Sequence, residues 1–304
     1  MTAGAALDGE QRARPYRGRF APSPTGPLHL GSLVAALASW LDARRHGGAW
    51  LVRIEDIDPP RERPGAADAI LRTLEFLGLH WDEPVLRQST RAEAYMLALD
   101  ALRNRGLAYP CGCTRRELSG APYPGTCRDG LAPGRSARAV RLRIEVPSVE
   151  FLDRFQGPRT ISIGAVTGDV VLRRADGLWA YNLAVSVDDA WQRISHVVRG
   201  ADLIDTTAAQ IHIHRALGCD PPAFAHVPVI LGIDGKKLSK QNRAPPIAGA
   251  DPGRVMRVAL AMLGQHPPAQ LARAPPGELL DWARLHWAPE CLGGVLERAG
   301  SHTP

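Results

Sequence analysis

The three lysines of the chain, Lys236, Lys237 and Lys240, lie within five residues of one another in the segment GKKLSKQ. Every other residue among the 37 lysines and arginines is an arginine. A lysine carries a compact charge on a flexible stem, which suits contact with a phosphate chain whose geometry changes during a reaction. The segment is equally compatible with a solvated basic turn after Gly235. A second phosphate-binding feature elsewhere in the chain would favour the first interpretation.

A helix start that could bind a nucleotide is expected near the N-terminus, in RFAPSPTGPLHLGS (residues 19–32). The amide groups of a helix's first turn lack partners inside the helix and carry the positive end of its dipole. Gly31 has no side chain, so a nucleotide could lie close against this helix start. His29 could donate a hydrogen bond to a phosphate. Taken alone, a histidine at a helix start is also compatible with a cap or a surface residue.

Three of the five cysteines, Cys111, Cys113 and Cys127, form a cluster that is typical of a metal site. An odd cysteine count with such close spacing favours structural Zn²⁺ over disulfides. Spacing alone leaves the fourth ligand open between a water molecule and Asp129.

The composition is that of a globular protein, with 45% hydrophobic and 22% charged residues. The net charge of +6 and the pI near 9.4 weakly favour a polyanionic partner. The apolar run at residues 33–41 is about half the length that spans a bilayer, and residues 1–16 lack the apolar core of a signal peptide. We therefore expect a cytoplasmic protein with no membrane partner and a flexible tail over residues 1–16.

The elements expected from the sequence alternate between strand and helix, which indicates an α/β fold with a doubly wound parallel sheet. Residues 49–54 (AWLVRI) form a continuous apolar run, as expected for a strand that is buried on both faces. Gly47 and Gly48 should end the preceding helix. The expected strands are 18–21, 49–54, 139–146, 169–173, 178–187 and 227–233, and the expected helices are 30–45, 66–77, 91–105 and 206–217, with two short helices after residue 251.

Two motifs, HLGS (residues 29–32) and KLSKQ (residues 237–241), resemble in form and order the ATP-binding motifs of class I aminoacyl-tRNA synthetases. The segments VRIEDIDPPRE, GLHWDE, AYNLAVSVDD and VVRGADL are similar to the glutamate branch of that class, in particular to members that glutamylate tRNA(Asp). The resemblance extends over about residues 17–265. It implies a Rossmann-like catalytic domain over 17–106 and 188–243, an inserted zinc-bearing subdomain over 107–187 and a small helical segment over 244–304.

This resemblance implies that the chain activates L-glutamate with ATP and Mg²⁺, which yields glutamyl-adenylate and pyrophosphate. The glutamate would then pass to queuosine in the anticodon of tRNA(Asp). Because little sequence follows KLSKQ, we expect no separate anticodon-binding domain, and docking of the catalytic core on the anticodon loop is favoured. The alternatives are a shortened synthetase that charges the 3′ end of tRNA(Glu) or tRNA(Gln), and a catalytically silent tRNA-binding paralogue. A monomer is expected.

The resemblance also implies roles for individual residues. Glu55 would pair with the α-ammonium of glutamate, and Arg19 and Arg199 would hold carboxylate by bidentate hydrogen bonds. Without the resemblance, Glu55 is equally compatible with a surface carboxylate at a strand end, and Tyr181 with a packed aromatic residue. Lys240 would be the main phosphate contact.

The resemblance thus implies three sites, for glutamate, for ATP and for zinc. The glutamate site would consist of Arg19, Phe20, Ala21, Pro22, Ser23, Glu55, Tyr181 and Arg199. The ATP-binding and catalytic residues would be His29, Gly31, Ser32, Lys237 and Lys240. The zinc ligands would be Cys111, Cys113, Tyr123 and Cys127, with Tyr123 supplied by the resemblance and not by the spacing.

Overall fold

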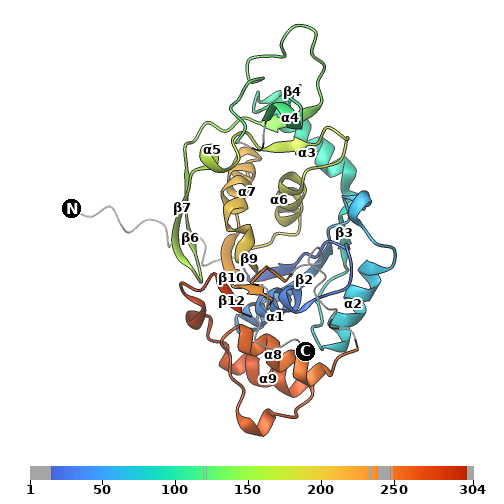
Figure 1. Ribbon diagram of the computed structural model, residues 1–304, viewed down its shortest axis with the longest axis vertical. Helices are drawn as coiled ribbons and strands as arrows, with labels where there is room; N and C mark the ends of the chain where they lie inside the picture. The colour runs from blue at the N-terminus through green and yellow to red at the C-terminus, as the bar shows by residue number, and fades with distance from the viewer. Residues whose placement is uncertain are drawn as a thin grey trace, which may run out of the picture.

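The computed structural model describes residues 15–118, 120, 122–232, 235–238, 247 and 249–299. The molecule is elongated, with helices α8 (Pro252–Met262) and α9 (Pro276–His286) at one end (Figure 1). Strand β4 (Ala108–Cys111) and the short helix α4 (Arg115–Leu118) lie at the opposite end, and a sheet lies between the two ends.

The central sheet is parallel, as the sequence predicts. Its two paired sets of strands lie side by side where the amide of Ser195 donates to the carbonyl of Arg17 (3.0 Å). In spatial order the strands are β3 (Leu86–Arg87), β2 (Ala49–Ile54), β1 (Arg17–Phe20), β9 (His196–Gly200) and β10 (Ala223–Val227). The helices around it are α1 (Leu30–Arg45), α2 (Ala66–Phe76), α3 (Ala92–Asn104), α6 (Tyr181–Trp191) and α7 (Ile204–Ala216).

Helices cover both faces of this sheet. Trp50 and Val52 of β2 belong to the core that contains α1, whereas Leu51 belongs to the core that contains α6 and α7. The same alternation places Val198 of β9 in the first core and Val197 in the second. Successive side chains of a strand point to opposite faces, so a strand covered on both faces is apolar at nearly every position. This is why residues 49–54 read as one apolar run. Arg53 is the exception in β2, and its buried guanidinium lies 2.8 Å from Asp189.

One expected strand is a helix. Residues 178–187 were expected to form a strand, but α6 begins at Tyr181 and runs to Trp191. Its buried positions include Leu183, Ala184, Val185 and Ser186, because α7 and α3 pack around it. A helix covered on several sides has no polar stripe, and such a run cannot be distinguished from a buried strand by periodicity alone.

A second expected strand is divided. The apolar run 227–233 contains the end of β10 at Val227 and the separate strand β11 (Val229–Leu231). Pro228 separates them, because proline has no amide hydrogen to donate to a sheet. Residue 233 lies outside the described residues.

Residues 107–173 interrupt the alternation of parallel strands and helices with two groups of antiparallel strands. β5 (Ala139–Leu142) pairs with β4 and with β8 (Val171–Arg173). β5 and β8 are both shorter than the strands expected over 139–146 and 169–173. β6 (Val149–Asp153) and β7 (Gly157–Ile161) form a hairpin, which the sequence did not indicate, and α5 (Ile163–Val166) follows it. β6 also pairs in parallel with β10. This hairpin therefore reaches the edge of the central sheet.

The two expected C-terminal helices are present as α8 and α9. Both pack against α1, and their buried residues belong to the same core as those of α1. Strand β12 (Glu297–Ala299) pairs in parallel with β11. The C-terminal segment thus adds to the layer on one face of the sheet.

Candidate active site

A pocket of about 230 Å³ lies at the carboxyl ends of β1, β2, β9 and β10. In open α/β sheets, ligands bind at this edge. Most of the residues that the sequence assigned to glutamate and ATP line this one pocket, although they come from distant parts of the chain. They are Arg19, Phe20, Ala21, His29, Gly31, Ser32, Glu55, Tyr181, Arg199 and Lys237.

Two residues of the expected glutamate site lie beside the pocket instead of lining it. The carbonyl of Pro22 accepts a hydrogen bond from the amide of Glu55 (3.0 Å). Ser23 is exposed, and its carbonyl accepts from the amide of Thr25 (2.9 Å). Both residues belong to the turn after β1, and Pro22 holds the backbone of Glu55 against that turn.

Glu55 is a buried carboxylate that follows β2 directly. Among the residues that the structure describes, its Oε1 atom has no hydrogen-bond partner. Arg53 Nη2 lies 3.6 Å from it, which is ion-pair distance but not a hydrogen bond. Burial raises the pKa of Glu55 to about 7, although Arg53 and Arg19 oppose this shift. A buried acceptor without a partner is costly, so the arrangement favours a ligand that donates a hydrogen bond here.

Arg19 forms an ion pair with Asp189, a residue that was not predicted from the sequence to belong to the site. Its Nε and Nη2 atoms donate to the two carboxylate oxygens of Asp189, at 3.1 and 3.3 Å. Arg53 Nη2 also lies 2.8 Å from Asp189. Burial would raise the pKa of Asp189, but Arg19 and Arg53 hold it well below its ordinary value. The only signal in the sequence was an acidic pair, Asp188 and Asp189, at the end of an otherwise apolar helix.

Arg199 is almost fully enclosed by acceptors of the protein. Its Nε donates to His226 (3.1 Å), and Nη1 donates to the amide oxygen of Gln210 (2.7 Å). Nη2 donates to the hydroxyl of Thr207 (2.8 Å) and to the carbonyl of Leu203 (3.2 Å). An arginine has five N–H groups, so within the described part of the chain one Nη1–H is left for a substrate. Arg19 and Arg199 were expected to hold the substrate's carboxylate by bidentate hydrogen bonds. In the structure, Nε and Nη2 of Arg19 and all three guanidinium nitrogens of Arg199 donate instead to other groups of the protein.

His29 acts as the N-cap of α1. Its Nδ1 accepts from the amide of Ser32 (3.2 Å), and the hydroxyl of Ser32 accepts from the amide of His29 (3.0 Å). The cap therefore places the ring hydrogen on Nε2, where it can donate to a phosphate. The capping and catalytic interpretations of His29 are compatible, because they use different ring nitrogens.

Gly31 brings the start of α1 close to the lysine segment. A Cβ at this position would lie 3.3 Å from the ring of His29 and 3.4 Å from the carbonyl oxygen of Leu238. Lys237 follows β11 on the same side, and its ammonium forms an ion pair with Asp202. Lys240 lies outside the described residues.

The cysteine cluster predicted from the sequence is assembled near the far end of the molecule. The Sγ atoms of Cys111, Cys113 and Cys127 all lie within 4.8 Å of one another. The Sγ atoms of Cys113 and Cys127 are 3.7 Å apart, close to the edge of about 3.8 Å expected for a tetrahedron with Zn–S bonds of about 2.3 Å. Tyr123 Oη lies 3.4 Å from Cys111 Sγ and 3.9 Å from Cys113 Sγ. The cluster could therefore hold a metal ion.

Two neighbours support this cluster. The guanidinium of Arg141 lies 3.9 Å from the centre of the Tyr123 ring and donates to Cys111 Sγ (3.4 Å). Gly168 has φ +62°, and a Cβ there would lie 2.0 Å from the carbonyl oxygen of Tyr123. Only glycine permits this approach of the chain to Tyr123.

A second pocket adjoins the first through Tyr181, which lines both. Its volume is about 680 Å³, and it lies between the antiparallel sheet of β4, β5 and β8 and the turn after β2. Four arginines line it against two aspartates, so it carries an excess of positive charge. The arginines are Arg61, Arg115, Arg141 and Arg174.

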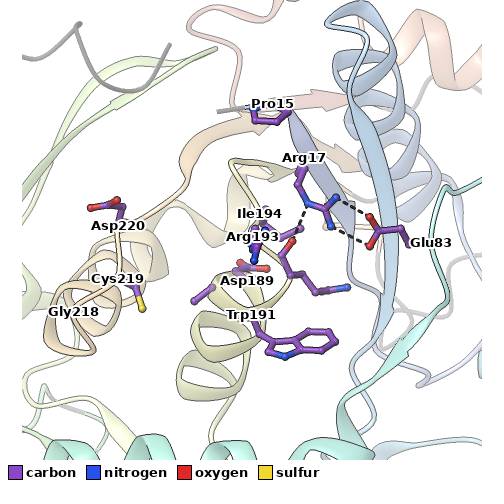
Figure 2. Close-up of a pocket in the computed structure, with 12 residues that line it drawn as sticks. Pro15, Arg17, Glu83, Asp189, Trp191, Arg193, Ile194, Gly218, Cys219 and Asp220 are labelled. Atoms are coloured by element: carbon purple, nitrogen blue, oxygen red, sulfur yellow. Dashed lines mark hydrogen bonds and ion pairs between the residues drawn. The ribbon is translucent and has the colours of Figure 1, made fainter. Parts of the chain in front are cut away.

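A larger pocket of about 930 Å³ lies elsewhere and is not the candidate site. Figure 2 shows its lining, in which Arg17 donates to both oxygens of Glu83, at 2.7 and 3.0 Å. Asp189 and the exposed Trp191 also line it, but none of the residues predicted to bind glutamate or ATP does. Its size therefore does not make it the site of the chemistry.

Comparisons with known proteins bear on these observations. The chain matches the family described as tRNA synthetases class I (E and Q), catalytic domain, over residues 16–122 and 126–247. It is 54% identical to the glutamyl-Q tRNA(Asp) synthetase of Thiobacillus denitrificans over 278 residues, which cover 89% of this chain and 92% of the relative. The chain belongs to the glutamyl-Q tRNA(Asp) synthetases. The resemblance stated from the motifs is confirmed.

Other relatives agree with this assignment. The glutamyl-Q tRNA(Asp) synthetase of Dechloromonas aromatica is 54% identical over 283 residues, which cover 90% of this chain and 94% of that one. A solved structure of a glutamate tRNA ligase from Elizabethkingia meningosepticum, in complex with its amino acid, aligns with a TM-score of 0.74 and 27% identity. That alignment covers 88% of this synthetase and 64% of the ligase, so the chain spans less than two thirds of the ligase's length.

Family membership makes this synthetase an ATP-dependent ligase of the aminoacyl-tRNA synthetase type, with a tRNA, glutamate and ATP as its partners. Among the described residues, no helix combines the length and apolar character needed to cross a membrane.

Proposed function

We propose that this synthetase activates L-glutamate with ATP and Mg²⁺ and transfers the glutamate to queuosine in the anticodon of tRNA(Asp). The observation that carries the proposal is the unsatisfied carboxylate of Glu55 in a pocket that also contains Arg19 and Arg199. An amino acid with a side-chain carboxylate supplies the complementary charges. Its α-ammonium donates to Glu55, and its carboxylate accepts from the N–H groups that the two arginines have left.

The activation step requires positioning and charge neutralisation more than covalent help from the protein, because the carboxylate of the substrate attacks the α-phosphorus itself. His29, the start of α1 and Lys237 all line the pocket, and the start of α1 lies close to the lysine segment. Lys240 follows in the same motif and is proposed as the main phosphate contact. Replacement of Lys240 by alanine should remove most adenylate formation without unfolding the protein.

The arginine-lined pocket supports a polyanionic acceptor next to the activated glutamate. It shares Tyr181 with the glutamate pocket, so an RNA loop bound there would bring a nucleoside to the adenylate. The names of the relatives point to tRNA(Asp) as this RNA. We propose in addition that Cys111, Cys113, Tyr123 and Cys127 hold one structural Zn²⁺, which would stabilise the segment that forms the far wall of this pocket.

One experiment separates this proposal from its alternatives. The protein is incubated with radiolabelled glutamate, ATP and tRNA(Asp) that either carries or lacks queuosine. Label that requires queuosine supports the proposal, whereas label on the 3′ end of tRNA(Glu) or tRNA(Gln) would show a shortened synthetase instead. A silent tRNA-binding protein would give no glutamate-dependent exchange of pyrophosphate into ATP, even with tRNA present.

A further inference from the structure

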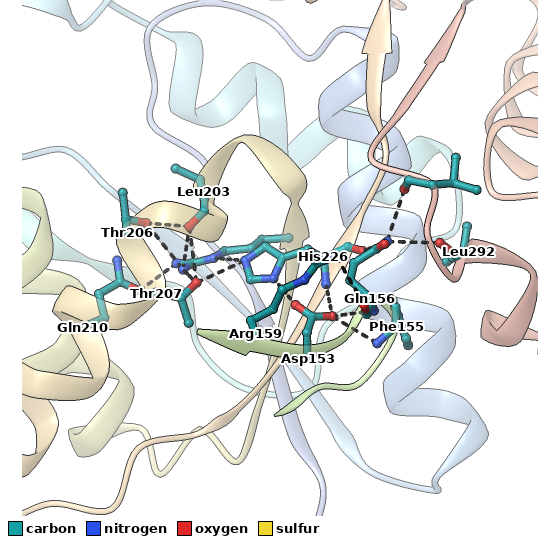
Figure 3. A network of polar contacts seen from close by, with 12 residues as sticks. Asp153, Phe155, Gln156, Arg159, Leu203, Thr206, Thr207, Gln210, His226 and Leu292 are labelled. Atoms are coloured by element: carbon teal, nitrogen blue, oxygen red, sulfur yellow. Dashed lines mark hydrogen bonds and ion pairs between the residues drawn. The ribbon is translucent and has the colours of Figure 1, made fainter. Parts of the chain in front are cut away.

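A chain of buried polar groups leads from Asp153 of the β6–β7 hairpin through His226 to Arg199. Figure 3 shows Asp153 and His226 side by side in this network. The carboxylate of Asp153 contacts Nδ1 of His226, and Nε2 of the same ring lies 3.1 Å from Nε of Arg199. The side chains of Asp153 and His226 are fully buried. Neither residue lines the glutamate pocket, and the function proposed above does not use them.

The direction of each hydrogen bond in this chain is determined by chemistry. Arg199 can only donate, so Nε2 of His226 must accept. The ring hydrogen is then on Nδ1, which donates to Oδ2 of Asp153. Burial lowers the pKa of His226 to about 4, so the ring is neutral at physiological pH and has one defined tautomer.

The other oxygen of Asp153 is fully engaged by backbone amides. Oδ1 accepts from the amides of Phe155 (3.0 Å), Gln156 (2.9 Å) and His226 (3.3 Å). The side chain of Gln156 in turn donates to the carbonyls of His226 (2.9 Å) and Leu292 (3.1 Å). The hairpin turn is therefore tied to β10 and to the C-terminal segment, and the carboxylate of Asp153 has one orientation.

We propose that Asp153 and His226 are positioning residues, which set the rotation of the Arg199 guanidinium so that its remaining Nη1–H points into the glutamate pocket. The inference deepens the proposed function and rests on its assignment of Arg199 to the glutamate. Gln210, Thr207 and Leu203 hold the two Nη atoms, and among the residues that the structure describes only His226 holds Nε. A planar fork that is held at all three nitrogens cannot rotate without losing a bond.

The substitution Asp153→Asn tests the tautomer without removing volume. The introduced amide oxygen would occupy the Oδ1 side, because three backbone N–H groups point there. Its NH₂ group would then face Nδ1 of His226, which would have to accept and would transfer the ring hydrogen to Nε2. The N–H group of His226 Nε2 and the N–H group of Arg199 Nε would then point at each other, and neither would have an acceptor. The hydroxyl of Thr207, 3.4 Å from Nε2, cannot relieve this clash, because Arg199 Nε would still lack an acceptor.

The measurement is steady-state pyrophosphate exchange, with KM determined separately for glutamate and for ATP. We expect Asp153→Asn to raise the KM for glutamate roughly tenfold to a hundredfold, the usual range for one misdirected hydrogen bond to a charged group. The KM for ATP should change by less than about twofold. NMR of the ¹⁵N-labelled histidine ring should show its hydrogen moving from Nδ1 to Nε2 of His226, with the signal assigned from its loss in His226→Gln.

The matched control is Asp42→Asn. Asp42 is also a fully buried carboxylate, bound by Tyr16, by Arg154 (2.5 Å) and by Trp287 (3.3 Å), but within the described part of the chain it forms no hydrogen bond with Arg199 or His226 and does not line the glutamate pocket. If Asp153 only stabilises the fold, both variants should lower the melting temperature and the amount of active enzyme and leave the KM for glutamate unchanged. That result would overturn the proposal.

His226→Gln provides the conservative rescue, because its amide oxygen can accept from Arg199 at the place of Nε2. His226→Gln should retain a KM for glutamate within about threefold of the wild type. Adding Asp153→Asn to this variant should have little further effect, because glutamine has no ring tautomer that Asp153 could select. Equal effects of Asp153→Asn in both backgrounds would contradict the proposal. An Arg199→Ala variant with an unchanged KM for glutamate would instead show that the assignment of Arg199 to glutamate is wrong.

Discussion

Arg19 and Asp189 form a two-point ion pair beside the proposed glutamate pocket, with Nε–Oδ1 and Nη2–Oδ2 distances of 3.1 and 3.3 Å. Both side chains are less than 5% exposed. The planar fork that could have bound the substrate's carboxylate is therefore bound to the protein. Its Nη1 atom takes no part in this ion pair, so Arg19 can contact glutamate from one fixed orientation.

Asp189→Asn should weaken glutamate binding and destabilise the fold together. The substitution leaves Arg19 and Arg53 buried without their shared anion, and removal of one partner of a buried pair typically costs about 3–5 kcal/mol. The free energy of unfolding in urea and the KM for glutamate measure the two effects. The exposed Asp205 serves as control, since Asp205→Asn should change neither quantity. An unchanged KM for glutamate in folded Asp189→Asn protein would rule out this role for the pair.

Glutamate activation should decline as the pH falls below about 7. The pKa of Glu55 is raised to about 7 by burial, so the free enzyme loses the negative charge that receives the α-ammonium as the pH decreases through that value. We expect kcat/KM for glutamate to decrease about tenfold per pH unit well below pH 7. Glu55→Gln should have a low kcat/KM without this pH dependence. A wild-type profile that is flat between pH 6 and 8 would contradict the assignment.

Glu55 should also make the stability of the fold depend on pH, and stability should change with pH in the opposite direction to activity. The folded protein keeps the proton of Glu55 up to about pH 7, whereas the unfolded chain loses it near the ordinary pKa of 4.5. The contribution of Glu55 to stability therefore declines as the pH rises from about 4.5 to 7. Urea unfolding across this range should show a smaller decline for Glu55→Gln than for the wild type.

Metal content should depend on the clustered cysteines and not on the isolated one. Cys127→Ser should abolish binding of one Zn²⁺ per chain and lower the melting temperature, because the proposed metal would close the loop between Cys111 and Cys127. Tyr123→Phe should keep the metal with weaker affinity, since three thiolates remain. Elemental analysis and competition with a chelator give the readout. Cys219→Ser is the control, and equal zinc in Cys127→Ser and wild type would exclude the site.

The arginine-lined pocket should matter for transfer and not for activation. Arg61→Ala and Arg115→Ala should each weaken tRNA binding and reduce the slope of log K against log salt by about 0.7–1, as expected for one lost phosphate contact. Glutamate-dependent pyrophosphate exchange without tRNA should be unaffected. Arg284→Ala, an exposed substitution on α9, is the control. If Arg284→Ala weakens tRNA binding as much as the pocket variants do, the effect is one of net charge alone.

Local signals predicted several elements closely. The expected bounds of α1 and β2 are those of the structure, because Gly47 and Gly48 end the helix and the continuous apolar run defines the strand. The helix α6 was predicted as a strand, since burial on several sides removes the polar stripe that reveals helical periodicity. The β6–β7 hairpin was not predicted, because Glu150, Phe151 and Leu152 give a short and weak alternation.

The sequence by itself determined the family and the residues that we propose for the chemistry. HLGS, the acidic strand end at Glu55 and the lysine segment are local patterns, and local patterns can be recognised without a fold. Tertiary structure decided which partner each charged group has. Arg19 faces Asp189, 170 positions away, and Arg199 faces His226, 27 positions away. Such pairings depend on which strands become neighbours, and no spacing along the chain contains that information.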